Sequence, residues 1–337
     1  MFKASISNVR RKFLPAAGIY YRAKEMILLS QKNIGALLVL LSAAGFSTLA
    51  IFIKLAYAAG ANTLTILTMR FLLASLCLWL LLPLLKISPR IQTKTAVKLG
   101  LMGALGYGSM SLAFAASLQY LPASLAEMLL FTYPTLVSLL SFLIGDEQFN
   151  WPKGASLVIC LLGLFFILGI SFTGLNQTGI LLGLSGAMIY SCYILIGNRV
   201  LKDVHSLVAT TYVASAAAFT FTAYSTATGQ LILDLPLQGW LALAGTATFG
   251  TILGILGFFA GITKIGAANA SIISTLEPVL TVLLSVLVLG EQLTLLQGFG
   301  GLLVIASILL LQLYTKDAKL TKPDLKVVPC HSREQQS

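Results

Sequence analysis

The sequence predicts an all-α integral membrane protein with ten transmembrane helices, arranged as two five-helix repeats of inverted topology. Three observations lead to this prediction: the hydropathy of the whole chain, the one-sided placement of Lys and Arg, and an internal repeat. Hydrophobic residues make up 57% of the 337 residues, charged residues only 10%, and the mean hydropathy is +0.91. Because soluble domains carry about 25% charged residues, this composition excludes a soluble protein.

Apolar segments of membrane-spanning length follow one another along nearly the whole chain. About 20 apolar residues cross a hydrocarbon core of about 30 Å. Each crossing segment has to be a helix, because lipid offers no partner for its backbone groups. Short polar or Gly-bearing turns separate the segments. The predicted spans are 33–57, 63–85, 97–117, 122–144, 152–171, 177–198, 206–228, 239–262, 267–289 and 294–314.

Lys and Arg lie on one side of this topology. They occupy the N-terminal segment, the connections and helix ends after spans two, four, six and eight, and the C-terminal tail. The connections after odd-numbered spans carry none, and only Lys54 and Arg70 lie inside spans. Since cytoplasmic loops are enriched in positive charge, we expect a multi-pass protein of a cell membrane, most simply a bacterial inner membrane, with both termini cytoplasmic. The net charge of +11 then reflects membrane orientation and not a nucleic-acid partner.

Two polar segments flank the spans. Residues 1–32 are basic, and three interpretations stay open: a membrane-surface or targeting segment, a cytoplasmic leader, or an over-extended start, since Met26 precedes the first span. Residues 315–337 form a polar tail, which we expect to be cytoplasmic and disordered from Lys316 onward.

An offset of 144 residues superposes the two halves of the chain, 33–171 and 177–314. The clearest matches are Gly35 with Gly179, Gly106 with Gly250, Pro134 with Pro278, and Glu147 with Glu291. Because each unit has five spans, the second copy enters the membrane upside down. Inverted repeats are typical of secondary transporters, which bind their solute near the midplane between the repeats. Some channels and membrane enzymes also use inverted duplication.

Several short segments in the same register carry a family resemblance. They are Phe71-Leu72-Leu73-Ala74 after Arg70, Leu118 to Ala126, Tyr133-Pro134, Leu276-Glu277-Pro278 and Leu289-Gly290-Glu291. Through them, residues 33–314 resemble the EamA-type drug/metabolite transporter superfamily. The resemblance implies a ten-helix solute carrier with a central cavity, commonly an exporter of metabolites, amino acids or related compounds.

Four charged residues lie inside the spans: Lys54, Arg70, Glu127 and Glu277. Each costs about 2.5–3.5 kcal/mol on insertion scales, so each needs a compensating role. Charge alone suggests that Glu127 pairs with Arg70 or Lys54 near the outer side, as an outer gate or a docking site for a carboxylate-bearing solute. A purely structural ion pair remains an equal alternative for Arg70 and Glu127, and for Lys54 we favour snorkelling to the interface.

Glu277 lies mid-span, directly before Pro278, and a kink is expected there and at Pro134. One hypothesis is that Glu277 binds and releases a proton that is coupled to solute movement. The alternative is a glutamate that only stabilises the kink. Tyr133 is its repeat equivalent, so the two residues are expected to face each other across the pseudo-twofold axis.

Three further tyrosines lie mid-span, Tyr107, Tyr190 and Tyr193, and they are suited to lining a cavity or to ordinary packing. Glycines in spans three and eight fit close helix contacts or, equally, flexible points in the helices; they are Gly103, Gly106, Gly250, Gly254 and Gly257.

The inverted repeat and these residues predict a secondary transporter that moves a small solute by alternating access. The family resemblance implies that the solute is a metabolite, an amino acid or a drug-like compound and that the protein is an exporter. We expect a lipid environment, protons as the coupling ion, and neither a cofactor nor a metal. A receptor or scaffold that moves no solute is the main alternative. An intramembrane enzyme is a weaker one, because the only histidines are His205 and His331, at a helix end and in the tail.

Overall fold

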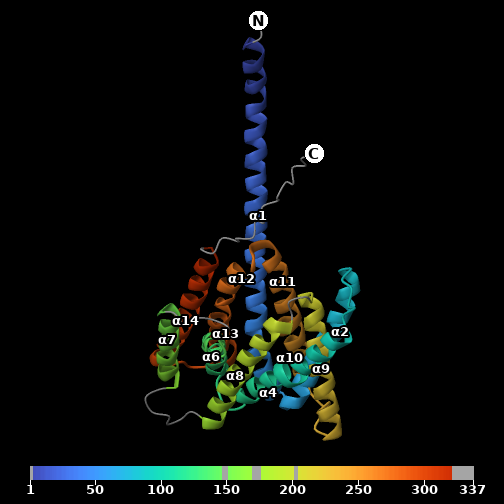
Figure 1. Ribbon diagram of the computed structural model, residues 1–337. Helices are drawn as coiled ribbons and strands as arrows, with labels where there is room; N and C mark the ends of the chain where they lie inside the picture. The colour runs from blue at the N-terminus through green and yellow to red at the C-terminus, as the bar shows by residue number, and fades with distance from the viewer. Residues whose placement is uncertain (1–2, 146–150, 169–175, 201–203, 321–337) are drawn as a thin grey trace, which may run out of the picture.

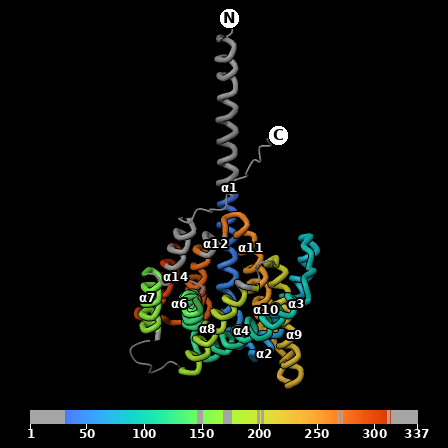
Figure 2. The backbone as a smooth tube through the Cα atoms, in the orientation of Figure 1, coloured from blue at the N-terminus to red at the C-terminus, as the bar shows by residue number. Residues whose placement is uncertain are grey.

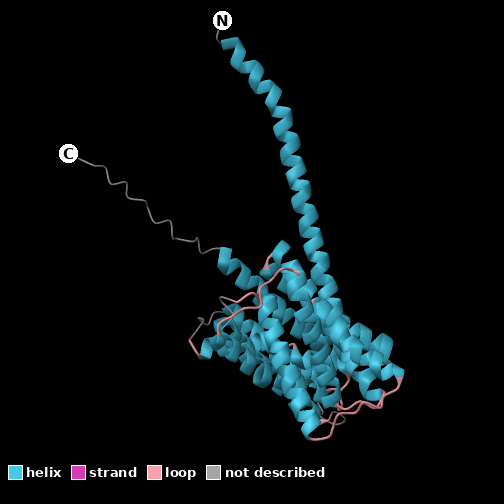
Figure 3. Ribbon diagram, turned by 90° about the vertical axis from the view of Figure 1, so that its right-hand side faces the viewer, coloured by secondary structure: helices cyan, strands magenta, loops and turns pink. Residues whose placement is uncertain are grey.

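The computed structural model describes residues 3–145, 151–168, 176–200 and 204–320. Its described part consists of helices joined by short connections (Figures 1 and 3). Eight helical segments are long and apolar enough to cross a membrane, and two shorter apolar helices cover Trp151–Ile167 and Leu295–Leu310. All ten lie where spans were predicted. The prediction of an all-α, multi-pass membrane protein is therefore confirmed.

The described residues of the first half form eight helical elements. They are α1 (Lys3–Ala58), α2 (Thr63–Leu84), α3 (Thr93–Leu101), the π-helical segment η1 (Met102–Tyr107), α4 (Gly108–Ser117), α5 (Ala123–Leu130), α6 (Tyr133–Leu143) and α7 (Trp151–Leu168). The third span is thus built from α3, η1 and α4, and the fourth from α5 and α6.

The second half repeats this order. Its elements are α8 (Gln177–Val200), α9 (Ser206–Ala227), α10 (Leu237–Ala247), the π-helical segment η2 (Thr248–Leu253), α11 (Gly254–Ile265), α12 (Ala267–Ser274), α13 (Leu276–Leu289) and α14 (Leu295–Leu320). The eighth and ninth spans are interrupted at the same places as the third and fourth.

Both ends of the described chain differ from the predicted boundaries. Helix α1 begins at Lys3, far before residue 33, although its membrane-length apolar part begins only at Gln31. Helix α14 continues to Leu320 and so extends into the segment predicted to be disordered. The remainder of the tail, residues 321–337, lies outside the described residues, as does Glu147.

The N-terminal end of α1 and the C-terminal end of α14 lie on the same side of the helix bundle, here called the terminal face (Figure 1). The connections predicted to share a side are hydrogen-bonded to one another. On the opposite face, Asn62 Nδ2 donates to the Gln230 carbonyl at 2.6 Å and Gln119 Nε2 donates to Thr63 Oγ1 at 2.7 Å. At the terminal face, Lys264 Nζ donates to Gln31 Oε1, and the Tyr212 hydroxyl donates to the Pro89 carbonyl at 3.2 Å.

The fourth and ninth spans each consist of two helices, and the second helix begins just before the proline. Pro134 lies in the first turn of α6, and Pro278 lies in the first turn of α13. Proline is tolerated in a first turn, where its missing N–H has no intrahelical acceptor, but it disrupts a continuous helix. Each break places a candidate site residue at the start of the second helix of the span. Tyr133 is the first residue of α6, and Glu277 is the second residue of α13.

Glycines allow the close helix contacts that were expected. A Cβ added to Gly257 in α11 would lie 2.8 Å from the carbonyl oxygen of Leu38 in α1, and one at Gly103 would collide with the backbone of Val213 in α9. The other predicted glycines, Gly106, Gly250 and Gly254, meet side chains of α8 or α1 in the same way. These contacts hold the helices around the centre of the molecule at short separations.

A separate glycine pair joins α7 to α14, which lie side by side at one edge (Figures 1 and 2). A Cβ at Gly163 would lie 2.8 Å from the Gly300 carbonyl oxygen. The main buried core lies on the other side, where α1, α2, α4, α9 and α10 meet around side chains such as Ile53, Phe71 and Leu243.

Candidate functional site

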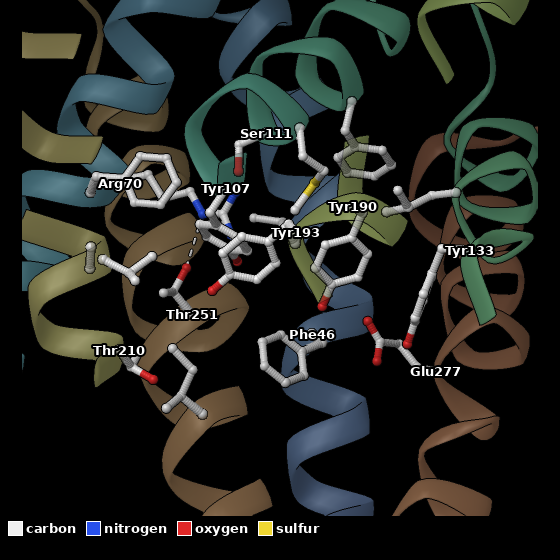
Figure 4. Close-up of a pocket in the computed structure, with 18 of the residues that line it drawn as sticks. Phe46, Arg70, Tyr107, Ser111, Tyr133, Tyr190, Tyr193, Thr210, Thr251 and Glu277 are labelled. Atoms are coloured by element: carbon white, nitrogen blue, oxygen red, sulfur yellow. Dashed lines mark hydrogen bonds between the residues drawn. The ribbon is translucent and has the colours of Figure 1, made fainter. Parts of the chain in front are cut away.

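A cavity of about 250 Å³ lies between the two halves of the chain. Every residue singled out as a candidate solute contact lines it (Figure 4). These residues are Arg70, Tyr107, Glu127, Tyr133, Tyr190, Tyr193 and Glu277. They come from α2, η1, α5, α6, α8 and α13, so the arrangement of the helices brings together residues far apart in sequence.

Much of the cavity wall consists of residues that occupy equivalent positions in the two repeats. At the 144-residue offset, the pairs are Phe46 with Tyr190, Leu49 with Tyr193, Arg70 with Ala214, Tyr107 with Thr251, Ser111 with Ile255, and Tyr133 with Glu277. A cavity walled by such pairs lies at the interface that relates the repeats, where inverted-repeat folds place their binding site.

Arg70 is held by hydroxyl groups and not by a carboxylate. Its side chain is 2% exposed, its Nε donates to Thr251 Oγ1 at 3.0 Å, and its Nη2 donates to the Tyr107 hydroxyl at 3.3 Å. Those two partners are themselves a repeat-equivalent pair. The predicted ion pair between Arg70 and Glu127 is wrong: in the described part of the chain, no carboxylate lies within 4.0 Å of the guanidinium.

Lys54 does not pair with Glu127, and its favoured snorkelling to the interface stays a prediction. It is partly buried on α1, does not line the cavity, and interacts electrostatically with Glu291. The Glu291 carboxylate accepts hydrogen bonds from the Ser124 backbone N–H at 3.1 Å and from Ser124 Oγ at 2.7 Å, and also from Ala123 N–H. A carboxylate at a helix N-terminus satisfies free N–H groups and complements the helix dipole, so Glu291 caps α5 from the other repeat.

Glu127 and Glu277 share the cavity and interact with each other electrostatically. Figure 4 shows the Glu277 carboxylate beside the hydroxyl groups of Tyr133 and Tyr190, and that Tyr133 and Glu277 face each other across the pseudo-twofold axis stays a prediction. Like charges repel strongly in a low-dielectric interior. Proton binding to either carboxylate therefore changes the net charge of the cavity and the repulsion within it.

The four cavity tyrosines form a connected aromatic group. The ring centroids of Tyr133 and Tyr190 are 4.6 Å apart, those of Tyr190 and Tyr193 are 5.9 Å apart, and those of Tyr193 and Tyr107 are 5.7 Å apart. Offset and edge-to-face contacts at these separations are favourable. The group provides an apolar wall that also carries hydroxyl groups.

Sequence reasoning missed several wall residues, among them Phe46, Leu49, Ser111 and Thr251. Three of them could have been predicted from the repeat. Phe46, Leu49 and Thr251 are the equivalents, at the 144-residue offset, of Tyr190, Tyr193 and Tyr107. Ser111 had none, since serine is common in these spans. Within the described residues, no group of three or more His, Cys, Asp or Glu side chains is arranged to hold a metal ion.

Comparison with known proteins identifies the family. The EamA-like transporter family matches the chain twice, over residues 33–169 and 177–313. The chain belongs to the EamA-like transporter family. The two matched stretches coincide with the two repeats, and the resemblance seen in the sequence is thereby confirmed.

Relatives of this EamA-family chain are themselves described only as transporters. It is 30% identical over 227 residues to the uncharacterized transporter sll1319 of Synechocystis sp., a match that covers 62% of this chain and 65% of the relative. It is 26% identical over 295 residues to the uncharacterized transporter YcbK of Bacillus subtilis, covering 83% of this chain and 94% of the relative. A solved crystal structure at 18% identity shares the fold, with a TM-score of 0.58 over 85% of this chain and 98% of that one.

Proposed function

We propose that this protein is a secondary transporter that moves a small solute through the central cavity by alternating access, as an exporter, with both termini in the cytoplasm of a bacterial cell. The observation that carries the proposal is the cavity wall made of repeat-equivalent residues. Rocking of inverted repeats about a shared site exposes that site to each side in turn. Polar groups inside the membrane are costly, and a solute path explains why so many of them converge here.

We further propose that protons drive the movement through Glu277. It faces Glu127 from α5, Tyr133 from α6 and Tyr190 from α8, and no basic group lies within ion-pair distance of it in the described part of the chain. A carboxylate in this setting changes the charge of the cavity when it binds a proton. Proton uptake from one side and release to the other then accompany the exchange of solute.

The test uses the purified full chain in proteoliposomes. Candidate solutes come from comparing metabolite pools of cells with and without the protein, and their flux is measured with and without an imposed pH gradient. We expect wild-type flux that is accelerated by the gradient. Glu277→Gln removes the titrating group, so its flux should lose the response to the gradient. Asp234→Asn makes the same chemical change on an exposed connection and should behave as wild type.

Two outcomes would contradict the proposal at different levels. If the reconstituted protein moves none of the solutes whose pools respond to it, a receptor or scaffold role replaces transport. If Glu277→Gln keeps the full response to the pH gradient, transport stands but Glu277 is a structural residue at the start of α13 and not the coupling group.

A further inference from the structure

The Arg70 guanidinium has unused hydrogen-bonding capacity. A guanidinium carries five N–H donors and stays charged in proteins. Two of these donors are bound by Thr251 and Tyr107, and the other three have no acceptor in the described part of the chain. The guanidinium also lies over the Phe71 ring, 5.0 Å from its centroid, but it has no ion-pair partner in the described part of the chain. Because a buried charge is costly in a membrane interior, an anionic partner would stabilise it.

Ser111 supplies an independent sign of a missing ligand. The residue is 1% exposed, and its hydroxyl group has no hydrogen-bond partner among the residues that the structure describes. Buried hydroxyls are nearly always paired, so an unpaired one calls for an explanation. Figure 4 shows the Ser111 hydroxyl pointing toward the end of the cavity that holds Arg70 and Tyr107.

The directions of the existing hydrogen bonds define what this end of the cavity can bind. Thr251 Oγ1 donates its only proton to the Thr246 carbonyl at 2.9 Å, so toward Arg70 it acts purely as an acceptor and as a positioning residue. The Tyr107 oxygen accepts from Arg70, which leaves its own proton free. The free groups at this end therefore include three N–H donors of Arg70 and the hydroxyl protons of Tyr107 and Ser111, so donors outnumber the acceptor lone pairs that the two hydroxyl oxygens keep.

We propose that Arg70, Tyr107 and Ser111 form a subsite that binds the carboxylate group of the transported solute. This inference rests on the proposed transport function and assigns its solute a chemical class. An acceptor-only anion satisfies a cluster of donors, and the two oxygens of a carboxylate match the planar fork of a guanidinium. The repeat equivalents of Arg70 and Ser111 are Ala214 and Ile255, so the subsite exists on one side of the repeat interface only.

The charges elsewhere in the cavity favour a carboxylate over a phosphate group. Glu127 and Glu277 line the same cavity, and each additional negative charge on the solute increases its repulsion from them. A carboxylate carries one negative charge, whereas a phosphate monoester carries about 1.5 to 2 near neutral pH. The tyrosine group beside the subsite suits an apolar or aromatic body on the solute.

The experiment measures binding to the purified full chain in lipid nanodiscs by calorimetry. The probes share one apolar body and differ in the end group: 3-phenylpropionate, its primary amide, and 2-phenylethylphosphonate. A smaller pair, butyrate and butyramide, controls for the size of the body. We expect each carboxylate to bind at least about tenfold more tightly than its amide, because hydrogen bonds to a charged group are the stronger ones.

Variants test whether the preference for the acid over the amide arises at Arg70 and Ser111. Arg70→Gln should abolish the difference between acid and amide, and Ser111→Ala should reduce it several-fold. Ser111→Ala removes a hydroxyl that makes no bond within the protein, so its fold is expected to be intact even if Arg70→Gln is unstable. The matched controls are Arg90→Gln and Ser185→Ala, both at exposed positions, which should keep the wild-type difference. A merely structural role for these residues would weaken acid and amide equally.

Three results would overturn the assignment. If wild type binds acid and amide with equal affinity, or binds neither, the subsite is refuted. The proposed transport function is not refuted by that result, because it is tested separately by solute flux in proteoliposomes. Tighter binding of the phosphonate than of the carboxylate refutes the choice of anion. If Ser111→Ala and Arg70→Gln both keep the full wild-type preference for the acid over the amide, the solute carboxylate binds at another position.

Discussion

Tyr190 connects the two chemical ends of the cavity at the scale of single residues. Its ring contacts Tyr133 beside Glu277, and it also packs against Tyr193 and Tyr107 beside Arg70. The ring therefore supports the wall, while its hydroxyl lies near the Glu277 carboxylate (Figure 4). These two contributions are separable by mutation.

Removing the whole Tyr190 ring should destabilise the protein, whereas removing only its hydroxyl group should leave the stability unchanged. We expect Tyr190→Ala to lower the free energy of unfolding by about 3 kcal/mol, in the range for large-to-small aromatic substitutions. Tyr190→Phe should keep the wild-type unfolding temperature but change the rate of solute flux. Thermal unfolding in detergent and flux in proteoliposomes measure the two effects. Tyr224→Phe, at an exposed position of α9, is the control. A Tyr190→Ala protein as stable as wild type would contradict the role of the ring in packing.

Much of the cavity was predictable residue by residue, because charges and tyrosines in the middle of a span are rare and need a role. Arg70 and Glu277 were identified on that basis alone. The hydrogen-bond partners of Arg70 were not identified, because the direction in which a side chain leaves its helix depends on helix rotation and tilt. Arg70 therefore meets Thr251 and not Glu127, an outcome set by tertiary packing.

At the scale of elements, the two π-helical segments position the residues that hold Arg70. Tyr107 is the last residue of η1, and Thr251 lies within η2. A π-helical turn contains an additional residue, which changes the direction of the side chains and is frequent at functional sites. The Thr251 hydroxyl bonds to the carbonyl five residues earlier, at Thr246, which matches the wider turn.

The sequence predicts the proline breaks but not the π-helical segments. Pro134 and Pro278 interrupt a helix for a local covalent reason, so the breaks in spans four and nine follow directly from the residues. A π-helical turn has no comparable local cause, since it depends on what the neighbouring helices require. The glycine contacts were predictable only in part. Gly103 and Gly257 were expected at helix interfaces, but the sequence did not indicate that their partners lie on α9 and α1.

The contact between α7 and α14 depends on glycine at one position of α14 and not at another. A Cβ at Gly300 would lie 2.7 Å from the backbone nitrogen of Ile167, whereas one at Gly298 would meet no atom within 4 Å. We expect Gly300→Ala to lower the free energy of unfolding by about 1 to 3 kcal/mol through overpacking. Gly298→Ala should be neutral or stabilising, because alanine favours the helix. Equal unfolding temperatures for the two variants would show that the helices separate without cost.

At the scale of the whole molecule, the repeat explains both the architecture and the position of the site. Five spans per unit require opposite orientations in the membrane, and the connections are bonded within two separate faces as that topology demands. The fold was therefore predictable in outline from hydropathy and the 144-residue offset. What the offset does not predict is the packing of α7 against α14, away from the central cavity.

The orientation of the molecule in the membrane is testable with single cysteines. After replacement of the four native cysteines, Gln119→Cys and Gln230→Cys on the opposite face should react with a membrane-impermeant maleimide added to intact bacterial cells. Ser88→Cys, on an exposed and basic connection, should react only after the cells are permeabilised, because positively charged loops stay in the cytoplasm. Labelling of Ser88→Cys in intact cells would mean that the positive charges face outward.

A carrier made of two identical halves would face either side of the membrane with equal free energy, because one state would be the other turned over. Here the equivalent wall residues are chemically mismatched, with Arg70 opposite Ala214 and Tyr133 opposite Glu277. When the two halves exchange conformations, each charged group therefore meets different neighbours, so the two orientations differ in free energy. For the proposed alternating-access mechanism, we therefore expect the empty carrier to have a resting orientation of its own, set by the sequence differences between the two copies and not by their shared backbone fold.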